Sequence, residues 1–215
     1  MSDPTFIHQF VAPQSNASGR VLLLLHGTGG DENDMIPLGR DLDPEAGLLS
    51  LRGNVSENGM PRFFRRFAEG VFDEEDIVRR AKELADFIGE AAVRYDFNPA
   101  RMTAVGYSNG ANIAAAVLLL HGAVFKSAIL LRAMVPLTPP QLPGLAGVRV
   151  LICSGRCDKI IPVDNAEGLA ALLREGGADV VHRFEESGHQ LVFDEIARAS
   201  AWLRESSATG KSDVR

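Results

Sequence analysis

Gly106-Tyr107-Ser108-Asn109-Gly110 is the stretch of this chain that decides its fold. It matches the pattern G-x-S-x-G, in which a sharp turn from a strand to a helix lifts a serine hydroxyl above a sheet. Glycine is needed on both sides of the turn because larger side chains would collide with the neighbouring strand and helix. The pattern makes Ser108 a candidate nucleophile.

The residues on either side supply the strand and the helix that the motif requires. Residues 101–105 predict a short strand entering the turn. Residues 109–121 (NGANIAAAVLLLH) are rich in alanine and leucine, which favours a buried helix. Short glycine-serine patterns also arise by chance in a chain with 21 glycines among 215 residues. Because strand, turn and helix occur together here, a nucleophile is favoured over a plain structural turn.

Short apolar runs alternate with longer helical patterns along the chain. The runs are mostly continuous, which is typical of strands buried on both faces of a parallel sheet. They are residues 20–25, 47–51, 102–105, 127–131 and 148–152, with 179–184 as a further candidate and 6–12 as an antiparallel edge strand. The alternation predicts an α/β fold with a central, mainly parallel sheet and helices on both faces.

The clearest helical pattern begins at Asp73, whose side chain can cap a helix and is followed by three acids in the first turn. Apolar residues then recur along one stripe, at Ile77, Ala81, Leu84, Ala85, Ile88 and Ala92. Residues 163–174 and 191–204 predict two more helices. Residues 31–34 are expected to cap another, and the arginines and phenylalanines of residues 62–67 predict a helix with one basic and one apolar face.

The composition indicates one globular domain over residues 1–215, with residues 206–215 as a flexible tail. Hydrophobic residues make up 46% of the chain and charged residues 23%. The formal net charge of −6 is spread along the chain, so no nucleic-acid partner is expected. No segment approaches the roughly 20 apolar residues of a membrane span, and the N-terminus lacks a signal-peptide pattern. The expected location is cytoplasmic.

Cys153 and Cys157 are the two cysteines of the chain. Their C-x3-C spacing, with no histidine nearby, is poor evidence for zinc, and we expect no bound metal. Two free thiols in a reducing compartment are the expected state. A disulfide between the two is left open.

A serine hydroxyl becomes a nucleophile when a histidine base takes its proton, and an acid must hold that base in the right tautomer. Among the five histidines, only His26 and His189 lie in loops after predicted strands. His26 is followed directly by Gly27 and is expected to order its own loop. His189 follows the strand candidate at residues 179–184 and precedes a helix, so it is the expected base.

Asp158 is the expected acid. It follows the predicted strand at residues 148–152 and lies between Ser108 and His189 in the chain, which gives the order Ser, Asp, His that accompanies this motif. Other aspartates are explained in different ways. Asp164 belongs to the first turn of a helix, Asp179 starts a strand at the wrong end, and Asp194 lies within a helix.

The loop His26-Gly27-Thr28-Gly29-Gly30 follows the most apolar predicted strand. We predict that the backbone N–H groups of Thr28 and Asn109 form an oxyanion hole, in which each donor contributes about 3 to 4 kcal/mol to the stability of the transition state. Rival interpretations are weak, because the loop lacks the Lys-Ser/Thr of a P-loop and the last glycine of a dinucleotide fingerprint. Residues 31–34 lack the spacing of a calcium loop.

Apolar residues are expected to frame the pocket, and an apolar acyl or aryl group is their natural occupant. They are Met60, Phe63 and Phe64 on one side and Met134 and Val135 on the other. The alternative, that these side chains only cover the sheet, is equally favoured. The chain shows no separate cap domain, which predicts an open site suited to small esters.

At this point the residues resemble a known family. The loop at residues 26–30, the stretch Gly106-Tyr107-Ser108-Asn109-Gly110-Ala111-Asn112, Asp158 with Pro162, and Ser187-Gly188-His189 are similar to the phospholipase/carboxylesterase group of α/β-hydrolases, which includes the acyl-protein thioesterases. Residues 52–64 (RGNVSENGMPRFF) look like its bacterial branch of hydroquinone-linked hydrolases. The match covers about residues 21–202.

The resemblance implies an α/β-hydrolase fold, Ser108, Asp158 and His189 as a catalytic triad, and hydrolysis of carboxylic esters or thioesters without a cofactor. Residues 132–137 depart from the loop of the acyl-protein thioesterases, which does not favour a protein-depalmitoylating role. The expected partner is a small-molecule ester, and a homodimer is left open.

Two alternatives to an esterase remain at this stage. A ligand-binding protein could keep the hydrolase fold, and a fluorophosphonate probe would then leave no covalent adduct on Ser108. A dienelactone-type hydrolase is the other, and the serine counts against it because those enzymes generally use a cysteine nucleophile.

Overall fold

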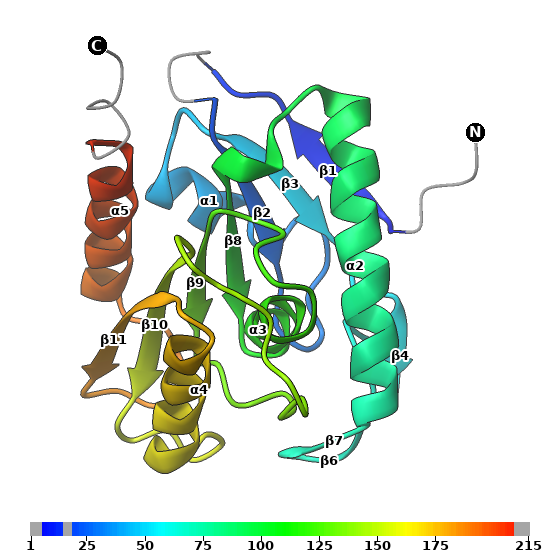
Figure 1. The fold of residues 1–215 in the computed structure, drawn as a ribbon, viewed down its shortest axis with the longest axis vertical. Helices are drawn as coiled ribbons and strands as arrows, with labels where there is room; N and C mark the ends of the chain where they lie inside the picture. Colours follow the sequence, from blue (N-terminus) through cyan, green and yellow to red (C-terminus); the bar gives the residue numbers. More distant parts are fainter. Residues whose placement is uncertain (1–5, 15–18, 209–215) are drawn as a thin grey trace.

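A sheet of seven strands runs through the centre of the computed structural model, which describes residues 6–14 and 19–208 (Figure 1). The strands are β1 (His8–Val11), β2 (Val21–Leu25), β3 (Gly47–Leu51), β8 (Met102–Tyr107), β9 (Ser127–Leu131), β10 (Arg149–Gly155) and β11 (Asp179–Glu185). Their order across the sheet is β1-β3-β2-β8-β9-β10-β11. β1 pairs antiparallel with β3, and the other pairs are parallel. The mainly parallel sheet with an antiparallel edge strand is therefore confirmed.

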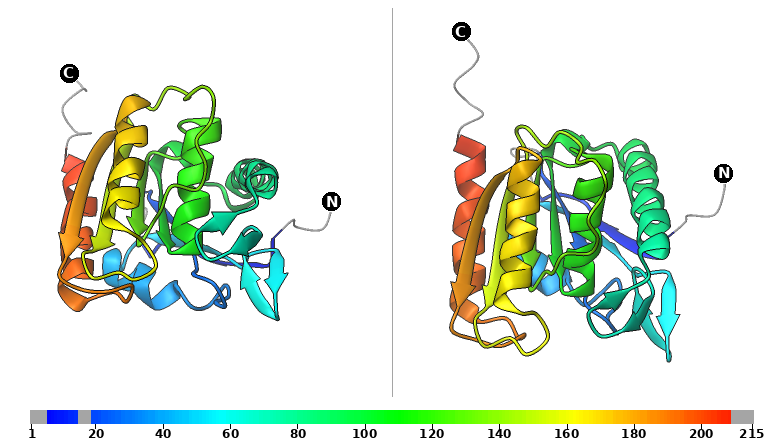
Figure 2. Two further views of the ribbon diagram at one scale, coloured as in Figure 1. Left: turned by 90° about the horizontal axis from the view of Figure 1, so that it is seen from below. Right: turned by 60° about the horizontal axis from the view of Figure 1, so that its bottom comes forward.

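Helices cover both faces of the sheet (Figure 2). They are α1 (Ile36–Leu42), α2 (Glu74–Tyr95), α3 (Asn109–His121), α4 (Val163–Glu175) and α5 (Phe193–Ala208), with a short 3-10 helix, η1 (Pro99–Arg101), before β8. The packing of their buried residues puts α2, α3 and α4 on one face and α1 and α5 on the other. This is the α/β architecture that the alternation of strands and helices predicts.

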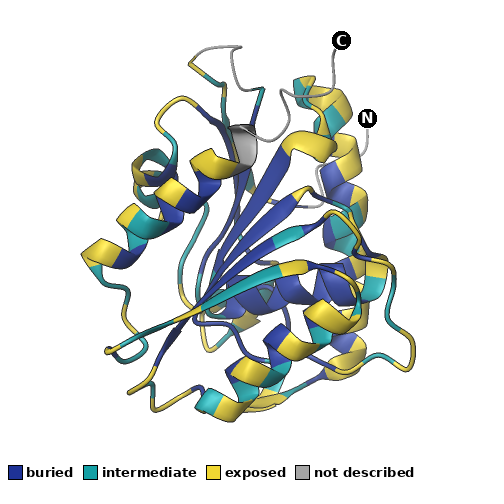
Figure 3. Ribbon diagram, turned by 60° about the vertical axis from the view of Figure 1, so that its left-hand side comes forward, coloured by how far each residue is buried: buried dark blue, intermediate teal, exposed yellow. Residues whose placement is uncertain are grey.

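The central strands consist largely of unbroken apolar runs because both faces of the sheet are covered by helices. Successive side chains of a strand point to opposite faces. In β2, Leu23 and Leu25 pack in the core under α2 and α3, whereas Leu22 and Leu24 pack in the core under α1 and α5. All of β2 is buried, and the middle of the sheet is buried in the same way (Figure 3).

The predicted start of α2 is confirmed by its hydrogen bonds. The Asp73 carboxylate accepts from the backbone N–H of Asp76 at 3.1 Å and so caps the helix. Ile77, Ala81 and Leu84 lie on the buried face that the 3.6-residue stripe predicts. In contrast, α3 is buried almost all round, because it packs between the sheet and α2. No helix in the described part of the chain combines the length and hydropathy of a membrane span.

The helix predicted for residues 62–67 is wrong. The segment instead belongs to two hairpins, β4 (Val55–Glu57) with β5 (Met60–Arg62), and β6 (Arg66–Ala68) with β7 (Val71–Phe72). Gly59 and Gly70, with φ of 82° and 73°, supply the left-handed backbone of the two turns. The expected basic face is also absent at Arg62, which is 2% exposed and donates to the carbonyl of Phe64 at 3.2 Å.

Residues 31–34 do not cap α1, which corrects a second prediction. The residue before α1 is Met35, and no side chain caps it. The carboxylates are used within the loop, where Asp31 accepts from the N–H of Asn33 at 2.8 Å and Asp34 from the N–H of Asp31 at 3.0 Å. Such local bonds compete with helix capping.

The flexible tail predicted for residues 206–215 is wrong for residues 206–208. α5 continues through residues 206–208, because its apolar face packs through Trp202 and Leu203 on the core under the sheet. The rest of the predicted tail, residues 209–215, lies outside the described residues.

Candidate active site

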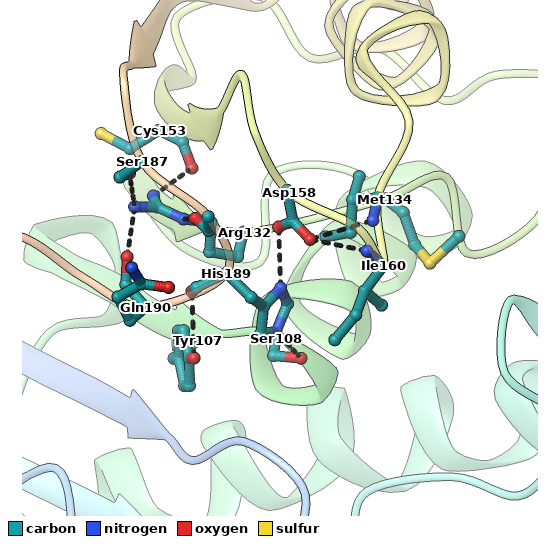
Figure 4. A network of polar contacts seen from close by, with 12 residues as sticks. Tyr107, Ser108, Arg132, Met134, Cys153, Asp158, Ile160, Ser187, His189 and Gln190 are labelled. Carbon is teal, nitrogen blue, oxygen red and sulfur yellow. Dashed lines mark hydrogen bonds and ion pairs between the residues drawn. The ribbon is translucent and has the colours of Figure 1, made fainter.

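The carboxyl ends of four parallel strands carry the residues that the sequence singles out. Thr28 follows β2, Ser108 follows β8, Asp158 follows β10 and His189 follows β11. These strand ends lie at the same end of the sheet, where open α/β sheets hold their ligands. Figure 4 shows that the structure brings Ser108, His189 and Asp158 together there.

The turn between β8 and α3 holds Ser108 in a strained conformation. Its φ of 52° and ψ of −114° lie outside the regions that serine prefers. Space explains the two glycines, because a Cβ on Gly106 would lie 2.5 Å from the nitrogen of Ala111, and a Cβ on Gly110 would lie 2.0 Å from the carbonyl oxygen of Leu25. The backbone N–H of Ser108 donates to the carbonyl of Leu131 at 2.8 Å. The turn is fixed on both sides by the sheet.

Ser108, His189 and Asp158 form a hydrogen-bonded line. The distance from Ser108 Oγ to His189 Nε2 is 3.0 Å, and the distance from His189 Nδ1 to Asp158 Oδ2 is 2.8 Å. The second oxygen of Asp158 accepts from the N–H groups of Ile160 and Ile161 at 2.8 and 3.2 Å. With the Nδ1 proton facing the carboxylate, Nε2 is free to accept a proton from the serine hydroxyl. This arrangement can activate a nucleophile.

Asp158 is shielded from solvent, whereas the His189 imidazole is partly accessible to it. The side chain of Asp158 is 1% exposed, whereas that of His189 is 21% exposed. A buried carboxylate that is fully hydrogen-bonded keeps one orientation, and the imidazole beside it can still exchange protons with a substrate or water.

Thr28 and Asn109 present backbone N–H groups at the same end of the sheet. Within the described residues, neither N–H donates a hydrogen bond. Asn109 is the first residue of α3, so the helix dipole favours negative charge beside its N–H. The side-chain oxygens of both residues are occupied elsewhere, since Asn109 Oδ1 accepts from the N–H of Phe63 at 2.7 Å and the Thr28 hydroxyl accepts from the Arg62 guanidinium. The Asn109 Nδ2 is buried and has no partner among the described residues. Both backbone donors are therefore available.

Three comparisons with known proteins bear on this site. No family model matches the chain. A protein of Bacillus subtilis (strain 168) named "Putative hydrolase MhqD" is 50% identical over 192 residues, which cover 89% of this chain and 96% of the relative. The crystal structure of a Bacillus cereus carboxylesterase superposes with a TM-score of 0.92 at 47% identity, covering 95% of this chain and 96% of the other. The chain belongs to the carboxylesterase-type α/β-hydrolase family.

A carboxylesterase from Mesorhizobium loti agrees with this assignment, with a TM-score of 0.86 at 33% identity over 95% of this chain and 97% of the other. The family predicted from the sequence is confirmed. This chain is an esterase-type hydrolase. Within the described residues, two short hairpins lie between β3 and α2 and no separate cap domain covers the strand ends.

The esterase presents only part of the apolar set predicted for its pocket. Met60 is 40% exposed and stands on β5 beside the Gly29 loop. Phe63 and Phe64 are 2% and 0% exposed and lie in the main core, so they support the hairpins instead of offering a surface to a ligand.

Met134 lies near Ser108 and Asp158 (Figure 4), and Val135 is the next residue in the chain. Met134 packs with Ile161, Ala166 and Phe72, and it is 7% exposed. Two asparagine side chains fix the backbone of this segment, because Asn112 accepts from the N–H of Met134 at 2.9 Å and Asn165 accepts from the N–H of Val135 at 2.8 Å.

His26 has the structural role that the sequence suggests. Its Nδ1 donates to the carbonyl of Gly27 at 2.6 Å, and its Nε2 accepts from the N–H of Gly53 at 2.9 Å. Burial lowers the pKa of this imidazole, so it stays neutral and keeps both bonds. His26 thus joins the glycine loop to the segment after β3.

Cys153 and Cys157 are both free thiols, as expected. Burial raises the pKa of Cys153 to about 12, which keeps that thiol protonated and unreactive, whereas Cys157 is exposed.

The sequence does not reveal Arg132, Glu195 and Tyr107, which hold the loop of His189. Arg132 directly follows β9, and its side chain is fully buried. A charged residue directly after a strand that is buried along its whole length is a signal that could have found it. Glu195 carries no such signal, because an acid in the first turn of a helix is ordinary.

Proposed function

We propose that this esterase works through an acyl-enzyme on Ser108, with His189 as the general base and Asp158 as the acid that orients it. The observation that carries the proposal is the hydrogen-bonded line from Ser108 Oγ through His189 to Asp158, at 3.0 and 2.8 Å. The strained turn under Ser108 supports it, because strain of this kind gathers at functional sites.

In the first half of the reaction, Ser108 Oγ attacks the carbonyl carbon of the ester while its proton passes to His189 Nε2. The carbonyl oxygen becomes negative and accepts hydrogen bonds from the N–H groups of Thr28 and Asn109. The bond from carbon to the leaving oxygen then breaks, and the alcohol leaves with the proton of His189. Asp158 stays ionised and stabilises the imidazolium.

In the second half, a water molecule takes the place of the alcohol. His189 removes a proton from that water as its oxygen attacks the acyl carbon of the ester on Ser108. The same two N–H groups hold the second oxyanion. When it collapses, Ser108 regains its proton from His189 and the carboxylic acid is released. No cofactor takes part in the proposed reaction.

Small esters with an apolar acyl or aryl part are the proposed substrates, with thioesters as a further class. Met60 and the half-buried Val135 are the proposed apolar contacts of the substrate, and Met134, at 7% exposure, contributes only its small exposed part. Phe63 and Phe64 drop out of this set because they are buried. A cytoplasmic location is part of the proposal, and the two free thiols support it.

Ser108→Ala tests the mechanism. We expect hydrolysis of p-nitrophenyl butyrate by this variant to fall by about 1,000-fold or more, because the nucleophile is lost while the fold stays. A fluorophosphonate should add to one serine of the wild-type protein, and peptide mass spectrometry should locate it at Ser108. Wild-type turnover by the variant, or an adduct elsewhere, would contradict the proposal. Near-ultraviolet circular dichroism of both proteins is the control for folding.

A further inference from the structure

One buried side chain, that of Arg132, donates several hydrogen bonds to the loop that carries His189. The Arg132 guanidinium donates to the carbonyl of Gly188 at 3.0 Å and to the carbonyl of Gln190 at 2.8 Å, the two residues on either side of His189 (Figure 4). It also donates to the hydroxyl of Ser187 at 3.1 Å. The loop backbone is therefore fixed immediately before and after the imidazole.

The other half of the guanidinium faces Glu195 at the start of α5. The two carboxylate oxygens of Glu195 accept from Arg132 at 2.5 and 3.0 Å, and one of them also accepts from the N–H of Val192 at 3.1 Å. Both side chains are 0% exposed. Glu195 thus neutralises the arginine and ties the far end of the same loop to it.

Only an arginine can make all of these contacts. A guanidinium has five N–H donors in a planar fork, and here its three nitrogens reach six acceptors, the last of which is the carbonyl of Cys153 at 3.2 Å. Lysine offers three donors from a single nitrogen and cannot span this set. Arg132 itself has a φ of 55°, a left-handed conformation that costs strain in a residue other than glycine.

Stability does not explain a buried pair of this kind. Replacing a buried ion pair by apolar side chains of similar volume is often neutral or stabilising, because the pair loses its hydration. The role of the Arg132–Glu195 pair is therefore sought in the loop around His189 that it binds. Another side chain also binds the backbone of this loop. The hydroxyl of Tyr107, the residue before Ser108, donates to the carbonyl of His189 at 3.1 Å. Three consecutive carbonyls of the loop are thus bound by side chains from β8 and the end of β9.

We infer that Arg132 and Glu195 form a clamp that positions His189 for proton transfer with Ser108. The inference rests on the proposed role of His189 as the base. Arg132 and Glu195 are positioning residues, since within the described contacts they bind the loop and not the imidazole ring or the serine. Without the clamp, the loop would move the imidazole away from Ser108 Oγ, and a displacement of about 1 Å can cost roughly 100-fold in rate.

Arg132→Lys is the decisive variant, because it keeps a positive charge opposite Glu195 and removes the fork. We expect its kcat on p-nitrophenyl butyrate to fall by about 100-fold while KM changes by less than about threefold, since the lost interaction acts in the transition state. Hydrogen exchange of residues 187–192 should become faster in the same protein. If this variant does not fold, the double variant Arg132→Met with Glu195→Met, which leaves no unpaired charge, should give the same two results.

Arg20→Lys is the matched control. Arg20 forms an ion pair with Asp43 at 2.9 Å, both side chains are mostly buried, and it lies at the amino end of β2, away from the candidate site. This variant should lose thermal stability and keep wild-type kcat, KM and exchange of residues 187–192. A purely structural role for Arg132 predicts the same behaviour for Arg132→Lys.

Each result then decides between the two roles. A fall in kcat together with faster exchange of residues 187–192 supports the clamp. A folded Arg132→Lys variant with wild-type kcat overturns it, as does one whose loop exchange is unchanged. Fluorophosphonate labelling of Ser108 in the wild-type protein tests the proposed function separately. Hydrogen exchange does not depend on turnover, so it tests the clamp even if the proposed function fails.

Discussion

At the scale of single residues, two glycines that look alike in the sequence have opposite environments. A Cβ on Gly110 would lie 2.0 Å from the carbonyl oxygen of Leu25 and 2.6 Å from that of His26, so backbone would have to move. Gly89 lies inside α2, and a Cβ there would meet nothing within 4 Å. Glycine is required at the first position by packing and is merely tolerated at the second.

Gly110→Ala and Gly89→Ala should therefore change stability in opposite directions. Gly110→Ala is expected to lower the free energy of unfolding by about 3 kcal/mol or more, because the methyl group overlaps the strand that precedes the glycine loop. Gly89→Ala is expected to raise it by about 0.5 to 1 kcal/mol through helix propensity. Urea unfolding of both variants checks this. Equal effects would mean that close packing of α3 on β2 does not require glycine at position 110.

At the scale of elements, the hairpin of β4 and β5 supports the loop that carries Thr28. The carbonyl of Pro61 accepts from the N–H of Gly29 at 2.9 Å, and the Arg62 guanidinium donates to the Thr28 hydroxyl. Burial lowers the pKa of Arg62, and Glu57, 3.6 Å away, partly offsets this. β5, which is remote from Thr28 in the sequence, thus fixes one proposed oxyanion donor.

Thr28→Val should weaken this support and Thr28→Ser should keep it. Valine has the shape of threonine and lacks the hydroxyl, so Arg62 would lose an acceptor in a buried place, at a cost of about 1.5 to 3 kcal/mol in stability. We expect kcat/KM of Thr28→Val to fall by about tenfold as the Thr28 N–H loses its position. Thr28→Ser should stay close to the wild-type enzyme. Steady-state kinetics and urea unfolding separate the two, and equal rates would show that the hydroxyl has no part in positioning.

At the scale of the whole molecule, we expect stability to depend on pH through a histidine in the edge strand of the sheet. His182 lies in β11, its Nε2 is 3.0 Å from the hydroxyl of Ser154, and its ring packs on Phe184. Burial, with a smaller contribution from Arg174, lowers the pKa of His182 to about 4, from an ordinary value of 6.5. The unfolded chain therefore binds the proton more readily than the folded chain does.

Acidification should lower the free energy of unfolding through this group. Because the folded pKa lies below the unfolded one, the unfolded state takes up more protons between about pH 6.5 and pH 4, and stability falls as the pH falls through that window. The loss from His182 between pH 7 and pH 5 is at most about 2 kcal/mol, because solvent screens this partly exposed ring. His182→Gln keeps a polar partner for Ser154 and does not titrate, so its loss should be smaller by that amount. Urea unfolding at both pH values measures the difference, and identical losses would rule out His182.

Much of the fold and of the candidate site could be read from local patterns. The strand, turn and helix around Ser108, the cap of α2 at Asp73 and the strands of the parallel sheet depend on residues close together in the chain. The positions of Asp158 and His189 follow from the rule that parallel strands bring their carboxyl ends together. The hairpins at residues 55–72 did not follow, because their arginines and phenylalanines also fit a helical face.

The sequence by itself determined the α/β fold, the turn that exposes Ser108 and the order of the three residues proposed to act together, because each rests on short-range pattern and on the geometry of parallel strands. Only the tertiary structure decided which side chains are buried beneath them. Arg132 and Glu195 lie 63 residues apart and meet only when β9 and α5 are in place. Phe63 and Phe64, which the sequence assigned to the pocket, lie in the core, and this too depends on contacts between distant segments. Contacts between distant segments depend on packing, which no local pattern records.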